Sequence, residues 1–250
     1  MSIAEALALL ATGVLGGIAS TVASVASVVS YPVLLAIGLS PLSANVTNTM
    51  SLICTAAGSA VGARPELSGQ RERALRLAMV TAIGGAAGAG ALLIAPASAF
   101  AVVVPALIAG ASALLLVQPL IGGLAPRPGA ERSRWRLAGV FAAATYMGYF
   151  GAAGGVVLLA ILGAMFSEPL IRLNALKNII SGAANAVAAT AFALFAPVDW
   201  AVVPLLAAGF LLGGVTGPRI ARRLPARALR TLVSLCGLAL AVKLGISAYR

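Results

Sequence analysis

The sequence contains no histidine and only six acidic residues among its 250 positions. The missing histidines exclude histidine-ligated zinc and haem sites and serine–histidine proteases of the membrane. Cys54 and Cys236 lie in separate apolar runs, so they form neither a disulfide framework nor a metal-ligand spacing. No GxxxxGK[ST] loop is present, which argues against ATP hydrolysis. We therefore expect no enzymatic activity, no cofactor and no bound metal.

Charge is scarce throughout the chain, with 9% charged and 61% hydrophobic residues. A soluble domain of this size could not bury so much apolar surface in one core. The chain instead offers several stretches near the roughly 20 residues that one helical membrane crossing requires. It begins with Glu5 and no Lys or Arg before the first apolar run, which argues against a cleaved signal peptide. The composition predicts an all-α, multi-pass integral membrane protein.

The net charge of +11 comes from residues interleaved with the apolar runs, which argues against a nucleic-acid partner. The positive-inside rule places three arginine-rich loops on the cytoplasmic side. Between the first two loops, Leu77–Ala95 and Phe100–Val117 are predicted to cross out and back. The loop arginines are Arg64, Arg71, Arg73 and Arg76, then Arg127, Arg132, Arg134 and Arg136, then Arg219, Arg222, Arg223, Arg227 and Arg230.

The apolar run Leu137–Phe166 is about 45 Å long as a helix, too long for one upright crossing and too short for two. A single crossing would also place the third arginine loop outside. A broken, re-entrant hairpin removes the conflict, because glycine tolerates the backbone angles of a sharp turn. Leu176–Ala196, Val202–Val215 and Thr231–Ser247 then alternate correctly. The predicted turn or gate residues are Tyr149, Phe150, Gly151, Gly154 and Gly155.

The N-terminal run Ile3–Leu39 is similarly overlong and predicts a matching hairpin, with Ser24 and Ser27 near its turn. Each half, residues 1–125 and 126–250, would then hold one hairpin and three transmembrane helices. An odd number of crossings inverts the second repeat in the membrane, as in many secondary transporters. Eight ordinary transmembrane helices remain the alternative.

Internal similarity favours the repeat. Asn48 and Ser51 recur as Asn178 and Ser181, 130 residues later. The full matched sets are Thr47, Asn48, Ser51 and Thr55, and Lys177, Asn178, Ser181 and Asn185.

The same residues form polar stripes at helical spacing, and amides or hydroxyls at membrane depth are costly unless paired or hydrated. Lys177 adds a positive charge, and every acidic residue maps near a membrane end or loop, which favours an anionic substrate. The predicted substrate-binding residues are Asn45, Asn48, Ser51, Asn174, Lys177, Asn178, Ser181 and Asn185.

Purely structural interpretations of these residues, without a role in substrate binding, stay open. The amides are also typical of interhelical hydrogen bonding, which is our preferred interpretation of Thr55 and Ser59. Lys177 is near enough to Arg172 to extend toward the cytoplasmic interface instead. Tyr149 and Phe150 also suit simple packing.

Four motifs carry a family resemblance: SYPVLLAIGLSPLSANVTNTMSL, RPELSGQR, GYFGAAGG, and NALKNIISGAANAVAATAF followed by VDW. Over nearly the whole chain they resemble the TauE/SafE family of sulfite and organosulfonate exporters. The resemblance implies a multi-pass carrier of the inner membrane that moves sulfite, sulfoacetate or a related organosulfonate. Members usually have a glycine-rich first hairpin, whereas this chain has Ser24, Val25, Ala26 and Ser27.

The sequence thus predicts a secondary transporter that exports a small sulfur-containing anion by alternating access. Its predicted partners are the anion and the lipid bilayer, and a homodimer is compatible with the sequence. One alternative is a channel-like anion facilitator. Another is a membrane factor that passes a sulfur species to a partner enzyme through a reactive cysteine.

Overall fold

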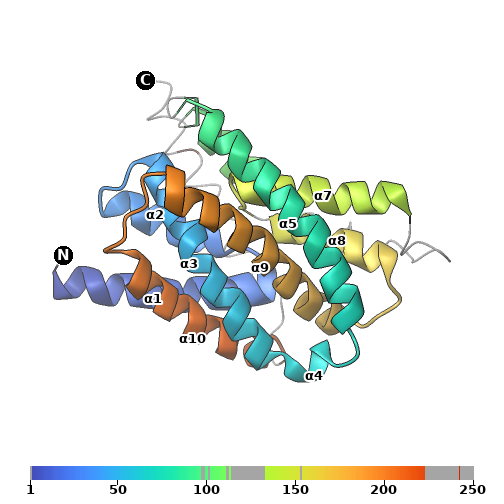
Figure 1. The fold of residues 1–250 in the computed structure, drawn as a ribbon. Coiled ribbons are helices and arrows are strands. Elements are labelled where there is room, and N and C mark those ends of the chain that lie inside the picture. Colours follow the sequence, from blue (N-terminus) through green and yellow to red (C-terminus); the bar gives the residue numbers. More distant parts are fainter. Residues whose placement is uncertain are drawn as a thin grey trace.

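The computed structural model describes residues 2–96, 99–100, 102–110, 113, 133–152, 154–222 and 242. Every regular element in these ranges is a helix, which confirms the all-α prediction (Figure 1). The predicted span Thr231–Ser247 lies outside the described residues apart from position 242, and Phe100–Val117 is described only in part, with 102–110 helical. The helices are α1 (Ile3–Ala23), α2 (Ala26–Ala36), α3 (Pro41–Gly62), α4 (Arg64–Leu67), α5 (Arg71–Ile94), α7 (Arg134–Tyr149), α8 (Gly154–Met165), α9 (Leu170–Phe195) and α10 (Val203–Ala221).

Four of the described helices, α1, α5, α9 and α10, are long and apolar enough to cross a membrane. Large apolar side chains point away from the protein along α5, including Met79 and Ile83, and would be unfavourable in water. Trp135 and Trp200 are 88% and 56% exposed, at the start of α7 and just before α10. Exposed tryptophans near helix ends are typical of the two membrane–water interfaces. The fold is that of a multi-pass membrane protein.

Helices α1 and α10 pack backbone to backbone through glycines (Figure 1). A Cβ added at Gly13 would lie 2.5 Å from the carbonyl oxygen of Leu206, and one at Gly17 would lie 2.9 Å from the Cα of Gly213. Because later positions in α1 contact later positions in α10, the two helices run in the same direction. Small residues at such contacts are the usual means of close helix packing in membranes.

The helix α3 contacts the other side of α10 in the same direction, since Gly58 lies against Gly214 and Gly62 against Pro218. The helices α5, α7 and α9 form a second set whose members also run in one direction. Gly182 of α9 contacts Ala56, whereas Asn178, one turn earlier, bonds to Ser59. Contact between α3 and α9 is therefore antiparallel, and the two sets of helices point in opposite directions.

Both overlong apolar runs are interrupted. In the first, Ser24 has a φ of 64° after the end of α1, a backbone conformation that usually requires glycine. In the second, Gly151 has a φ of 76° between α7 and α8. After each break the chain folds back, since α2 lies antiparallel to α3 and α8 antiparallel to α7. With 11 and 12 residues, α2 and α8 are about 17 Å long, roughly half a bilayer core.

Ion pairs gather at one end of the helix bundle, which we call the arginine-rich end. Glu168, just before α9, contacts Arg73 at 3.3 Å and Arg172 at 3.0 Å. Arg222, just after α10, lies 2.8 Å from Glu66 in α4. These pairs bring the first and third arginine clusters to the same end, as far as their residues are described. Charged groups at this depth cost little because water and headgroups reach them.

The close contacts along α5 predict opposite effects for two glycines of that helix. A Cβ at Gly85 would lie 2.5 Å from the carbonyl oxygen of Ala184, whereas nothing lies within 4 Å of one at Gly90. We expect Gly85→Ala to destabilise the protein by about 1–3 kcal/mol through overpacking. Gly90→Ala should be neutral or slightly stabilising, because alanine favours helix more than glycine. Thermal unfolding in detergent measures both, and equal effects would contradict the packing described.

The arrangement also predicts the side of the membrane that each loop faces. Ser167 lies beside Glu168 at the arginine-rich end, and Ala201 lies beyond the far end of α9; both are exposed. With Cys54 and Cys236 replaced by alanine, Ser167→Cys should react with an impermeant thiol reagent only from the cytoplasm. Ala201→Cys should react only from outside. Labelling of both from one side would overturn the arrangement.

Candidate functional site

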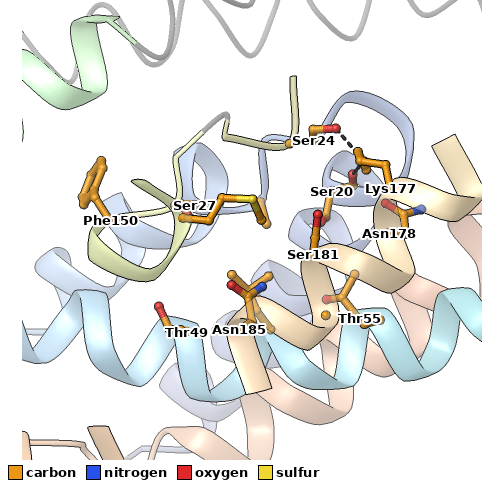
Figure 2. A pocket seen from close by; sticks show the side chains of 17 residues that line it. Ser20, Ser24, Ser27, Thr49, Thr55, Phe150, Lys177, Asn178, Ser181 and Asn185 are labelled. Atoms are coloured by element: carbon orange, nitrogen blue, oxygen red, sulfur yellow. Dashed lines mark hydrogen bonds between the residues drawn. The ribbon is translucent and has the colours of Figure 1, made fainter. Parts of the chain in front are cut away.

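A cavity of about 50 Å³ lies where both helix breaks meet α3 and α9 (Figure 2). One water needs roughly 10–15 Å³ on this measure, so the space suits a few waters or an anion of a few heavy atoms. Its lining residues are Ser20, Ser24, Ala26, Ser27, Thr49, Leu52, Thr55, Ala56, Met147, Phe150, Gly151, Gly155, Lys177, Asn178, Ser181, Gly182 and Asn185.

The two breaks touch each other at the cavity wall. A Cβ added at Gly155 would lie 2.8 Å from the Cβ of Ser24 and 3.4 Å from the Cδ of Lys177. The lack of a side chain at Gly155 therefore lets the start of α8 reach the first break. This contact brings polar groups from both halves of the chain to one place.

Among the described residues that line the cavity, Lys177 alone is charged, and it is 2% exposed. Its Nζ donates to the Ser24 hydroxyl at 2.5 Å and to the Ser20 carbonyl oxygen at 3.3 Å, as the dashed contacts in Figure 2 show. The side chain reaches α1, so it does not extend to the interface. An ammonium has three donors, and a buried charge without a carboxylate is unfavourable. An anion in the cavity would offset that cost.

Asn178 forms part of the wall between this cavity and a smaller one of about 10 Å³. Its amide donates to the Ser59 hydroxyl at 3.0 Å and so joins α9 to α3. The smaller cavity also contacts Glu66, Asn174 and Pro218, toward the arginine-rich end.

Three further lining residues carry polar groups without protein partners. The hydroxyls of Thr55 and Ser181 are buried and make no hydrogen bond with any described residue. The Asn185 side chain also makes no hydrogen bond with any described residue. This residue is 9% exposed. Buried polar groups are normally paired with protein or water, so these three groups are available to a ligand or to water.

Two predicted binding residues, Asn45 and Asn174, lie outside the main cavity and have matching contacts. Asn45 donates to the carbonyl oxygen of Tyr149 at the end of α7, at 3.0 Å. Asn174, 129 residues later, donates to the carbonyl oxygen of Thr21 near the end of α1, at 2.6 Å. Each amide thus donates to a carbonyl group at the end of a helix that belongs to the other half of the chain. Such carbonyl groups have no partner within their own helix.

The predicted residues Asn48 and Ser51 also lie outside the cavity lining. Asn48 donates to the Ser27 hydroxyl at 3.1 Å and accepts from the Ser30 hydroxyl at 2.6 Å, which joins α2 to α3. Ser51 donates to the Thr47 carbonyl oxygen one turn earlier at 2.9 Å. Asn48 therefore supports the first hairpin, whereas Ser51 bonds only within α3 in the described structure.

Of the predicted hairpin or gate residues, Tyr149 and Gly154 lie outside the cavity lining, whereas the other five line it: Ser24, Ser27, Phe150, Gly151 and Gly155. The ring of Phe150 packs edge-on against Tyr31 at 5.7 Å and Phe100 at 6.0 Å between centroids. Phe150 therefore lines the cavity at a distance from Lys177 (Figure 2) and is held by an aromatic cluster.

Sequence reasoning missed several lining residues, among them Ser20, Thr49 and Met147. Ser20 had a detectable signal, since it lies one helical turn before Ser24 on the same face of α1. The sequence favours interhelical hydrogen bonding for Thr55, yet Thr55 lines the cavity and its hydroxyl makes no hydrogen bond with any described residue.

These features define a multi-pass membrane protein with a polar, positively charged site among its helices. The chain belongs to the sulfite exporter TauE/SafE family, whose model matches residues 9–244. The family is one of membrane transporters of sulfite or related sulfur compounds rather than of enzymes. No curated protein and no solved structure matches the chain significantly.

The contacts of Asn45 and Asn174 predict a mainly structural effect for both. Asn45→Leu and Asn174→Leu should each lower the free energy of unfolding by about 1–3 kcal/mol, because a buried carbonyl loses its donor. Asn185→Leu is the matched control, since it breaks no hydrogen bond in the described structure and should change stability little. Thermal unfolding of the three variants in detergent measures this. A larger loss in Asn185→Leu would contradict the assignment.

Proposed function

We propose that this chain is a secondary transporter that exports a small sulfur-containing anion across the inner membrane by alternating access. Sulfite, sulfoacetate and related organosulfonates are the proposed substrates. One observation carries the proposal: the ammonium of Lys177 is buried at the cavity, and its partners among the described residues are all neutral oxygens. A site of this kind favours an anion and repels cations.

The order and direction of the helices support two inverted repeats, residues 1–125 and 126–250. The hairpin α1–α2, followed by α3 and α5, corresponds in order to the hairpin α7–α8, followed by α9 and α10. The corresponding helices point in opposite directions, since α1 runs with α10 while α7 runs with α5. Each hairpin would then be re-entrant, with one entering from each face of the membrane.

Inverted repeats favour a carrier, because two similar halves can exchange conformations around a site between them. The cavity lies between the halves, with Ser24 and Thr55 from the first and Gly155 and Lys177 from the second. In this proposal the anion binds at Lys177 and Asn178, and the two halves then rearrange to open the opposite side.

A channel-like facilitator would use the same polar lining, and its flux would not saturate or show counter-transport. The thiol-transfer alternative receives no support from Cys54, which is half-buried beside a hydrophobic cluster and does not line the cavity. Cys236 lies outside the described residues.

Flux in proteoliposomes tests the proposal. Wild-type protein should carry sulfite with saturable kinetics and exchange it against sulfite on the other side. Lys177→Gln should lower the flux at least tenfold, because a buried charge-assisted contact is worth about 1.5–3 kcal/mol. Arg219→Gln, which removes an exposed charge outside the cavity lining, is the matched control and should transport normally.

Normal flux in Lys177→Gln would overturn the site. Flux that rises linearly with concentration, without exchange, would favour the channel. Absence of any anion flux in the wild-type protein, with folded protein in the vesicles, would overturn the proposed function.

A further inference from the structure

The hydroxyls of Thr55 and Ser181 have no role in holding the described structure together, yet both are buried at the cavity. We propose that they bind the transported anion and, with Lys177, contact the three oxygens of a sulfite or sulfonate group. The site would thereby select anions with three oxygens on one atom over planar carboxylates. The inference rests on the proposed function and specifies which chemical group the cavity recognises.

Comparison with other hydroxyls in the same helices shows why these two are unusual. Serine and threonine inside a helix commonly donate to the carbonyl oxygen one turn earlier. Thr49 and Ser51 of α3 do so, at 3.0 and 2.9 Å, and so does Thr190 of α9, at 2.9 Å. Thr55 and Ser181 make no such bond, although the carbonyl groups of the preceding turn are equally near in a regular helix.

Neighbouring contacts hold the two hydroxyls on facing helices. Next to Thr55, Ala56 contacts Gly182, the residue after Ser181, so closely that an added Cβ would collide. One turn away, Asn178 donates to Ser59 at 3.0 Å. The spacing of α3 and α9 is therefore fixed on both sides of Ser181 and directly beside Thr55.

Lys177 completes the group, because it lies one turn before Ser181 on α9. Figure 2 shows Lys177 and Ser181 along the same side of α9, with Thr55 across from them on α3. The ammonium already uses two of its donors on Ser24 and Ser20, which leaves one for a ligand. Together, this ammonium donor and the two hydroxyls give three hydrogen-bond donors for one ligand.

A pyramidal SO₃ group offers three oxygens that point to one side, so each donor can meet one of them. A carboxylate offers only two oxygens, both in one plane, so two of the three donors must share one oxygen in a poorer geometry. Sites built for a full set of well-aligned hydrogen bonds discriminate against a ligand that meets them less well. The hydroxyls also bind anions without adding charge, which keeps the site from holding the anion too firmly for release.

The test uses full-length protein in detergent and compares Thr55→Val and Ser181→Ala with Thr81→Val. Thr81 is also a buried threonine, but its hydroxyl donates to the Ile180 carbonyl oxygen at 2.7 Å and joins α5 to α9. The ligands are methanesulfonate and acetate, which share a methyl group and a single negative charge. Calorimetry gives Kd, and thermal unfolding gives stability.

We expect wild-type protein to bind methanesulfonate at least tenfold more tightly than acetate. Thr55→Val and Ser181→Ala should each weaken methanesulfonate binding about tenfold, with a smaller effect on acetate and no loss of thermal stability. Thr81→Val should lose stability and keep the Kd for methanesulfonate.

Unchanged methanesulfonate binding in both Thr55→Val and Ser181→Ala would overturn the inference, as would equal wild-type affinity for the two ligands. If the inference fails in this way but Lys177→Gln still lowers sulfite flux at least tenfold, the proposed function stands without the inference. If wild-type protein neither binds methanesulfonate nor transports sulfite, both proposals fail.

Discussion

The arrangement of the site depends on one constraint, the burial of the Lys177 ammonium between the two helix breaks. A charge in this position is tolerated only with hydrogen-bond acceptors close by, and α1 supplies them through Ser20 and Ser24. The strained backbone at Ser24 and the missing side chain at Gly155 bring these acceptors and the ammonium together. The protein therefore holds the basic group of Lys177 beside the cavity, with no carboxylate partner among the residues the structure describes.

The supporting framework is made of small residues. Glycines let α1 and α3 approach α10, and let α7 and α9 approach α5, at distances that any side chain would prevent. Such contacts hold helices together in lipid, where the hydrophobic effect provides no attraction between them. Asn45 and Asn174 then satisfy the carbonyl groups that the two breaks expose. The cavity lies where the two sets of helices meet, beside the contacts that join α3 to α9.

Much of this arrangement follows from sequence patterns, and the rest does not. Run length and arginine spacing located the breaks, because bilayer thickness limits how long a helix may be. The polar stripes located α3 and α9 as the helices that carry the site. Periodicity could not separate Asn45 and Asn48 from Asn178, since all lie on the inward face and only the position of the partner helix decides which reaches the cavity. The interhelical hydrogen bond expected of Thr55 is absent from the described structure, because the sequence does not show whether the neighbouring helix places an acceptor within reach.

The central claim is that an anion occupies the space beside Lys177. Selenite, a heavier three-oxygen analogue of sulfite, allows a direct test by crystallography of the bound protein at the selenium edge. The account predicts one anomalous peak within hydrogen-bonding reach of the Lys177 ammonium and the hydroxyls of Thr55 and Ser181. A peak elsewhere in the membrane region, with this cavity filled only by water at saturating selenite, would contradict it.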